Sequence, residues 1–259
     1  MKLDKKRTAI RISLLVQFAL VFIFSCTDDD VMQTSIPYET CNVTIPNCDP
    51  LNFAADESSV QEITASPCHE DGGMYDLVAD SKKYLWFTCS NISALTFEST
   101  SGEEIDLSVE KRVHKKENVL RFNNPTDDCP DSVFESIDEI MEVELLNEEV
   151  NIRYRLTLSP GGFNLSVFDG LVVDRTTFDD EREFWSNRNL LIYLNSRDGN
   201  EIFGNYSFST KHNIMGQEYR NVYFNDNAER EIYYNKECGL IAFRGENGVL
   251  WKFKDIVLK

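Results

Sequence analysis

Six cysteines after the N-terminal region carry thiols that could form disulfides or bind a metal ion. An even number of cysteines in an oxidising compartment favours disulfides. A structural zinc site usually takes its ligands in closely spaced pairs, and the sequence has only Cys68-His69, with His114 and His212 isolated. We therefore expect disulfides and no metal site. The candidate cysteines are Cys41, Cys48, Cys68, Cys89, Cys129 and Cys238.

The densest acidic patch of the second half could bind Ca²⁺, which prefers several oxygen ligands. It comprises Asp174, the run Asp179-Asp180-Glu181, and Glu183. This patch lacks the Asp-x-Asn-x-Asp-Gly spacing of a calcium loop. The sequence therefore favours a solvated acidic loop at these positions.

Catalytic signatures are missing from the sequence. It contains no Gly-x-Ser-x-Gly elbow, P-loop, dinucleotide fingerprint or His-Glu-x-x-His pair. The net charge of -18 and the pI near 4.6 argue against nucleic-acid binding, which needs clustered basic residues. The only basic cluster after the N-terminal region, Lys111–Lys116, is expected at an exposed strand end and turn, with contact to an acidic partner as the alternative. The sequence predicts neither an enzyme nor a cofactor.

Aromatic residues make up 12% of the chain. In β-sheets such residues usually form the core and cross-strand pairs. Several of them exposed in a row would instead give a surface on which sugars stack. The sequence leaves both alternatives open. The candidates are Tyr84, Trp86, Phe87, Tyr219, Tyr223, Phe224, Tyr233, Tyr234 and Trp251.

The first 25 residues have the pattern of a signal peptide. Five basic residues precede the apolar stretch Ile12–Phe24, which would span about 20 Å as a helix and is too short for a bilayer. The stretch ends in Ile23-Phe24-Ser25-Cys26, which resembles a bacterial lipobox. This resemblance implies that the Cys26 thiol carries a diacylglycerol and that Cys26 becomes the new N-terminus.

The acidic run Asp28, Asp29 and Asp30 follows Cys26 almost at once. Such a run resembles the surface-export signal of lipoproteins from the Bacteroidota, especially flavobacteria. The resemblance implies an outer-membrane protein that is held by lipid and faces the cell exterior. A solvated spacer is the alternative for these aspartates. Cleavage before Cys26 would leave a net charge of -22, so acyl chains rather than a basic patch would hold the protein at the membrane.

Composition divides the rest of the chain into a tether and a folded part. Residues 26–40 are acidic and polar, which predicts a tether. Residues 41–259 alternate apolar and polar positions in short runs, which predicts a β-rich ectodomain. The polar run 123–128 marks a candidate boundary between two halves near 123–147. Ser132 and Glu135 form a possible capping box, so we expect one short helix near 132–141.

Turn signals separate many short strand patterns in the second half. Ile152, Tyr154, Leu156 and Leu158 alternate with polar residues, and residues 159–162 are expected to form a turn. Asn247-Gly248 predicts a type I′ hairpin. About eight strands are expected from 150 to 253, with no alternation of strands and helices. The sequence predicts a mainly β fold, either an antiparallel hairpin-rich sandwich or a curved open barrel.

Location and fold class favour three hypotheses about function. The first is a non-enzymatic surface module that binds a glycan or a protein. The second is a lipid carrier or envelope-assembly factor, with a curved sheet around an apolar ligand. The third is a hydrolase with dispersed catalytic residues, which would need two carboxylates facing each other across a cleft.

Overall fold

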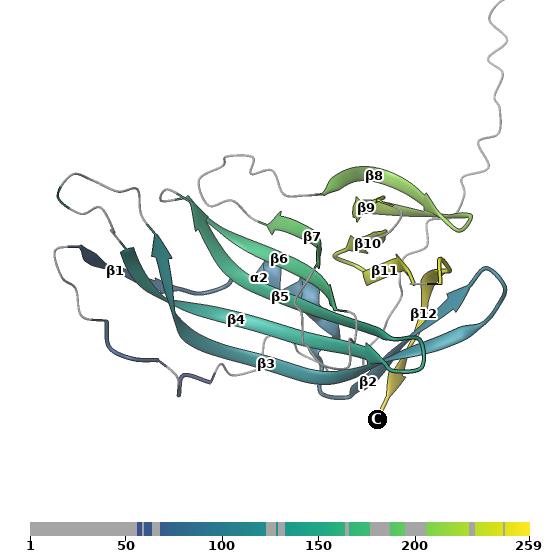
Figure 1. Cartoon of the computed structure of the whole chain (residues 1–259), viewed down its shortest axis with the longest axis horizontal. Helices are drawn as coiled ribbons and strands as arrows, with labels where there is room; N and C mark the ends of the chain where they lie inside the picture. The colour runs from purple at the N-terminus through teal and green to yellow at the C-terminus, as the bar shows by residue number, and fades with distance from the viewer. Residues whose placement is uncertain are drawn as a thin grey trace, which may run out of the picture. The chain divides into compact units, whose positions relative to one another are not determined.

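The computed structural model describes residues 56–58, 60–63, 68–122, 128, 133–163, 166–176, 187–194, 206–227, 231–245 and 247–259. All of them belong to one compact unit made mainly of β-sheet (Figure 1). A short helical segment consists of α2 (Ala79–Lys82) and the 3₁₀ turns of η2 (Lys83–Thr88). The strands are β1 (His69–Tyr75), β2 (Ile92–Ser99), β3 (Glu104–Phe122), β4 (Val133–Asn147), β5 (Ile152–Phe163), β6 (Ser166–Thr176), β7 (Asn187–Leu194), β8 (Ser207–Ile214), β9 (Gln217–Asn225), β10 (Ile232–Asn235), β11 (Gly239–Arg244) and β12 (Leu250–Leu258).

The sheet is a meander whose two halves meet at β2 and β12. Its strand order is β7-β6-β5-β4-β3-β2-β12-β11-β10-β9-β8, and β1 pairs in parallel with β4 beside this path. Every pairing along the path is antiparallel. The fold is therefore the curved open barrel of the two expected architectures, and the expected eight strands after residue 150 are β5 to β12.

The two end strands of the sheet run in the same direction, so they could close the barrel only by a parallel ladder. Neighbours in an antiparallel sheet alternate in direction, so an antiparallel ring closes only with an even number of strands. The path holds eleven strands, and its end strands β7 and β8 therefore run in the same direction. The sheet curls until β7 lies beside β9, but in the described part of the chain β7 and β8 share no ladder.

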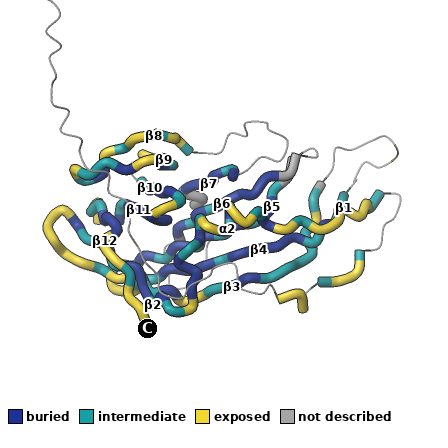
Figure 2. Tube along the Cα trace, turned by 180° about the vertical axis from the view of Figure 1, so that it is seen from behind, coloured by how far each residue is buried: buried dark blue, intermediate teal, exposed yellow. Residues whose placement is uncertain are grey.

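Alternation along the strands gives the sheet an apolar concave face. In β5, Ile152, Tyr154, Leu156 and Leu158 are buried, while Arg153 points outward, as the sequence predicts. Equivalent positions on the neighbouring strands complete one core, and Figure 2 shows this buried band along β4 to β7 and β10 to β12. On the opposite face of β4, Glu144 lies 2.7 Å from Arg153 and 2.9 Å from Arg155. The alternation of apolar and polar residues along the strands thus gives the sheet one apolar, buried face and one charged face.

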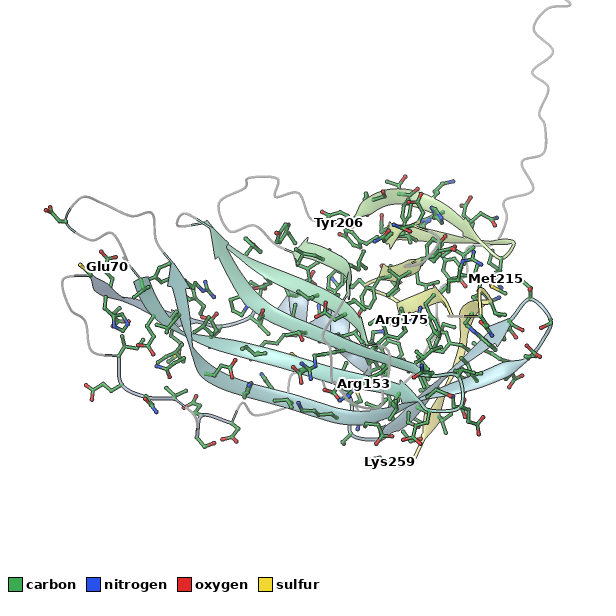
Figure 3. The ribbon with its side chains drawn as sticks, in the orientation of Figure 1. Glu70, Arg153, Arg175, Tyr206, Met215 and Lys259 are labelled. Atoms are coloured by element: carbon green, nitrogen blue, oxygen red, sulfur yellow. The ribbon has the colours of Figure 1, made fainter. Side chains whose placement is uncertain are left out.

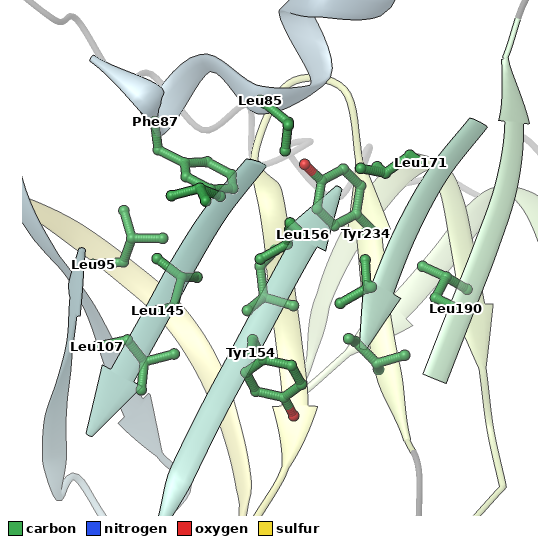
Figure 4. Packing of buried hydrophobic residues seen from close by; sticks show 14 of the residues in the cluster. Leu85, Phe87, Leu95, Leu107, Leu145, Tyr154, Leu156, Leu171, Leu190 and Tyr234 are labelled. Carbon is green, nitrogen blue, oxygen red and sulfur yellow. The ribbon is translucent and has the colours of Figure 1, made fainter. Parts of the chain in front are cut away.

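The α2–η2 segment covers the concave face. Its Leu85 and Phe87 side chains are completely buried against the strands (Figure 4). Leu85, at φ -109° and ψ 44°, interrupts the helical turns, so both side chains can point into the core. The apolar run 84–89 therefore forms a short plug in the open barrel.

The helix expected near 132–141 is wrong, because these residues lead into and form most of β4. Phe134, Ile137 and Ile140 have helical spacing, but the segment also carries β-branched residues that favour strands. β4 gains ladders on both sides, with β3 on one side and with β5 and β1 on the other. Tertiary pairing therefore decides between two locally possible structures. Residues 133–147 are an internal strand, whereas 123–127 and 129–132 lie outside the described residues.

Two turn predictions also need correction. Residues 159–162 lie within β5, where Pro160 and Gly161 pair with β6 beyond the last partner on β4. Gly161 is required there, since an added Cβ would lie 2.5 Å from the Phe168 ring. Of Asn247 and Gly248, only Gly248 has a positive φ (77°), so the hairpin lacks the type I′ geometry.

The basic cluster 111–116 lies in the middle of the 19-residue strand β3 and not at a strand end. Its side chains alternate between the two faces of the sheet. Lys111 lies 2.8 Å from Glu142, whereas Lys116 lies 3.1 Å from Asp76. The strand remains regular because acidic residues neutralise the cluster from both faces.

Candidate functional site

Four aromatic side chains meet at the β8 edge of the sheet, and we call them the aromatic edge cluster. They are Tyr84 of η2, Tyr206 directly before β8, Phe208 of β8 and Tyr223 of β9. The Tyr223 ring is central, with centroid distances of 5.0 Å to Phe208, 5.2 Å to Tyr206 and 6.5 Å to Tyr84. The register explains this meeting, because Phe208 and Tyr223 are direct cross-strand partners.

The cluster is exposed on one side and packed on the other. Phe208 is 49% exposed, whereas the three tyrosines are half-buried and pack against the core. Burial, followed by the charge interaction and hydrogen bond with Tyr223, raises the pKa of Tyr84. The Tyr84 hydroxyl therefore stays protonated and can donate a hydrogen bond. Such a surface offers apolar ring faces and polar hydroxyls together.

Charged groups flank the cluster in a balanced arrangement. Lys236 Nζ lies 2.5 Å from both Asp80 carboxylate oxygens and 5.9 Å from the Tyr84 ring centroid. Lys83 lies 3.4 Å from the same carboxylate. The Lys236 hydrogen bond is the main reason that the pKa of Asp80 is lowered. The flank therefore offers hydrogen-bonding groups without a large excess of either charge.

The rings of the cluster do not share one plane. Tyr223 is tilted by 47° to Phe208, 56° to Tyr84 and 81° to Tyr206. The cluster is therefore an angled surface and not a flat platform. Phe208 supplies the accessible ring of this surface.

Two carboxylates that face the concave side, Glu139 and Asp169, hold the start of the α2–η2 segment. Glu139 accepts a hydrogen bond from the Leu77 amide at 2.8 Å, and Asp169 accepts one from the Val78 amide at 2.9 Å. Glu139 also contacts Lys82 and lies 2.6 Å from His114 Nε2. Burial raises the pKa of Glu139, but these hydrogen bonds outweigh it and hold the pKa at about 2.

This arrangement suits anchoring better than acid–base catalysis. A general acid or base works best with a pKa near the operating pH, whereas Glu139 stays ionised far below it. Each carboxylate accepts a hydrogen bond from a backbone amide just before α2, and this bond anchors the α2–η2 segment to the sheet. The pair therefore does not resemble the facing carboxylates that a glycoside hydrolase needs.

The predicted N-terminal sites lie outside the described residues, namely Cys26, Asp28, Asp29 and Asp30. Cys41, Cys48 and Cys129 lie outside them as well. Of the other candidate disulfide cysteines, Cys89 and Cys238 are buried and Cys68 is half-buried. The disulfide framework therefore stays a prediction.

The described residues contain no group of three or more His, Cys, Asp or Glu side chains arranged to hold a metal ion. Asp174 lies on β6, where its backbone pairs with Arg155. The other members of the predicted acidic patch, residues 179–183, lie outside the described residues.

Sequence reasoning named Tyr84 and Tyr223 as aromatic candidates but missed Tyr206 and Phe208. The available signal was the composition around Phe208, which stands alone among Ser207, Ser209 and Thr210. A lone aromatic residue in such a polar strand is a candidate for an exposed ring. Its meeting with Tyr84 could not be predicted, because more than a hundred residues separate them along the chain.

Comparisons with known proteins give the chain no relative from which a function could be transferred. No protein-family model matches the sequence, and no curated protein or solved structure matches it.

Proposed function

We propose that this chain is a non-enzymatic binding protein of the cell envelope and that it binds a glycan at the aromatic edge cluster. The observation that carries the proposal is Phe208, a half-exposed ring backed by three packed tyrosines. Sugar rings present C–H groups that pack on aromatic faces and hydroxyls that hydrogen-bond to neighbouring polar groups. The cluster supplies both kinds of contact.

Charge favours a neutral glycan over a polyanionic one. The chain carries a net charge of -18, which repels polyanions at long range. At the cluster itself, Asp80 is paired with Lys236 and Lys83. A neutral ligand would bind without having to displace these ion pairs.

The proposed location rests on the N-terminal sequence. Lipid on Cys26 would anchor the protein in the outer membrane, and Asp28, Asp29 and Asp30 would direct it to the outer surface. No helix among the described residues is long and apolar enough to cross a membrane. We also propose that the six remaining cysteines form disulfides, since export exposes them to an oxidising compartment.

Calorimetric titration with neutral oligosaccharides selected on a glycan array tests the glycan proposal. Phe208→Ala should weaken binding at least about tenfold, which corresponds to about 1.4 kcal/mol. The matched control is Leu258→Ala, which removes another exposed apolar side chain (43%) from the end of β12. Unchanged affinity in Phe208→Ala, or no binding to any neutral glycan, would contradict the proposal.

A second candidate function is the carrying of an apolar ligand. The observation that favours it is the apolar concave face, which the short α2–η2 segment covers in part (Figure 4), while strands on the other side of the barrel also pack on it. Native mass spectrometry of protein purified without detergent tests this function. A carrier should retain about one lipid per chain, whereas a glycan-binding module should appear lipid-free.

A further inference from the structure

Three buried side chains on β5, β6 and β12 can donate hydrogen bonds inside the barrel, and we call them the donor cluster. They are Tyr154 of β5, Arg175 of β6 and Trp251 of β12. Their exposed fractions are 0%, 8% and 3%. The cluster is separate from the aromatic edge cluster and shares no residue with it.

The register makes Tyr154 and Arg175 neighbours and places Trp251 one residue further on, beside the Phe243 ring that Tyr154 contacts. Tyr154 and Arg175 are direct cross-strand partners in the β5–β6 ladder. The Tyr154 ring lies 5.2 Å from that of Phe243, and Phe243 is the cross-strand partner of Trp251. Arg175 Nη1 donates to the Arg244 carbonyl oxygen at 2.8 Å and so reaches across from β6 to β11. Figure 4 shows the Tyr154 hydroxyl pointing away from the plug residues Leu85 and Phe87, and Figure 3 shows Arg175 among the side chains between these strands.

Two of these donors are buried without an acceptor in the described structure. Among the described residues, neither the Tyr154 hydroxyl nor the Trp251 indole Nε1 has a hydrogen-bond acceptor. Buried polar groups are nearly always hydrogen-bonded, because an unmade bond costs their full desolvation. Burial raises the pKa of the Tyr154 hydroxyl and the nearby Arg175 lowers it, so the hydroxyl is a protonated donor at neutral pH. Both donors therefore need an acceptor that the described residues do not supply.

The chemistry of the cluster selects the acceptor. A hydroxyl and an indole N–H can each donate to an oxygen, and Arg175 adds a positive charge beside them. A carboxylate offers two oxygens with several lone pairs and a complementary negative charge. We propose that the donor cluster is a binding site for a carboxylate group, either of a small acid or of a longer acyl chain.

Thermal unfolding of the purified protein in sodium acetate, sodium decanoate and sodium chloride, at equal ionic strength, tests this site. Both carboxylates should raise the Tm above its value in chloride, and Tyr154→Phe should abolish the increase. An equal effect of the two salts assigns a small acid, whereas a larger effect of decanoate assigns an acyl chain. The control is Tyr219→Phe, a buried tyrosine whose hydroxyl already bonds Gln217 at 3.2 Å. Tyr219→Phe should have a lower Tm in every salt and keep the increase with carboxylate.

Two further readouts decide cases in which the Tm shift is small. Tyr154→Phe removes a hydroxyl that has no acceptor, so its Tm in chloride should equal or exceed that of the wild type. The indole ¹H–¹⁵N signal of Trp251, assigned with Trp251→Phe, should move on addition of carboxylate. A lower Tm of Tyr154→Phe in chloride, an equal carboxylate effect in both proteins, or an unmoved indole signal would overturn the proposal.

Discussion

Glu139 is buried, ionised and surrounded by donors, so its replacement tests how the α2–η2 segment is held. Glu139→Gln keeps the size of the side chain but removes the charge that Lys82 and His114 face. We expect a loss of about 3 kcal/mol in the free energy of unfolding at pH 7, because the pKa lies at about 2 instead of 4.5. Chemical denaturation measures this loss. Glu149→Gln, an exposed control, should change stability by less than about 0.5 kcal/mol.

The same carboxylate predicts a pH dependence whose sign follows from its lowered pKa. A group that ionises more easily when folded stabilises the fold at pH values above its unfolded pKa. This contribution should be complete above about pH 4.5 and should disappear as the pH falls towards about 2. The free energy of unfolding should therefore fall more steeply with acidification in the wild type than in Glu139→Gln. Parallel curves for the two proteins would contradict the role of Glu139.

Gly239 and Gly248 form a matched pair for testing backbone strain against packing. Both have positive φ angles, 67° and 77°. An added Cβ at Gly239 would lie 2.8 Å from the Phe87 ring, whereas nothing lies within 4 Å at Gly248. Gly248→Ala should therefore cost about 1 kcal/mol from strain alone, and Gly239→Ala about 2–4 kcal/mol. Equal losses in thermal or chemical unfolding would show that the plug is not packed against Gly239.

The α2–η2 segment is the element whose packing most affects the concave face. Phe87 is completely buried there, and its ring lies 5.4 Å from that of Trp86. Phe87→Ala should lower the free energy of unfolding by about 3–5 kcal/mol, because a large core side chain leaves a cavity. Leu120→Ala, at a position that is 61% exposed, is the control and should change stability little. Similar losses in both variants would mean that the segment is not part of the core.

Strands with strict alternation were predictable because their pattern reports directly on burial. β5 is the example, with Tyr154 and Leu156 inside and Arg153 outside. β4 was misassigned, since Phe134, Ile137 and Ile140 fit a helix as well as a strand until β3 and β1 supply ladders. The structure of the η2 segment could not be predicted, because a short apolar run lacks the period that separates a buried strand from a buried helical turn.

The candidate site was predictable only in part. Tyr84 and Tyr223 could be named as aromatic candidates. Whether their rings are exposed, and whether they contact each other, depends on how far the sheet curls. The same holds for the donor cluster, where Tyr154 and Arg175 become neighbours through register. The sequence identifies which residues can take part in binding, and the fold decides which of these residues lie together on one surface.

At the scale of the whole molecule, we propose that the N-terminal sequence determines where the protein is displayed. Labelled palmitate should enter the wild type and should not enter Cys26→Ala.

Replacing Asp28, Asp29 and Asp30 by Ala should keep lipidation and thermal stability, because these residues precede the folded part. Protease treatment of intact cells should then cleave less of the triple variant than of the wild type, with a periplasmic marker protected in both. Equal cleavage would leave the aspartates as a spacer only.

The most direct test of glycan binding at the aromatic edge cluster is aromatic ¹H–¹³C NMR during titration with a neutral oligosaccharide. The ring signals of Phe208, Tyr206, Tyr223 and Tyr84 should move together and saturate with one affinity. The signals of buried rings in the main core, such as Phe97 and Phe243, should stay in place. Unmoved Phe208 and Tyr223 signals at glycan concentrations that saturate binding would contradict the proposed site.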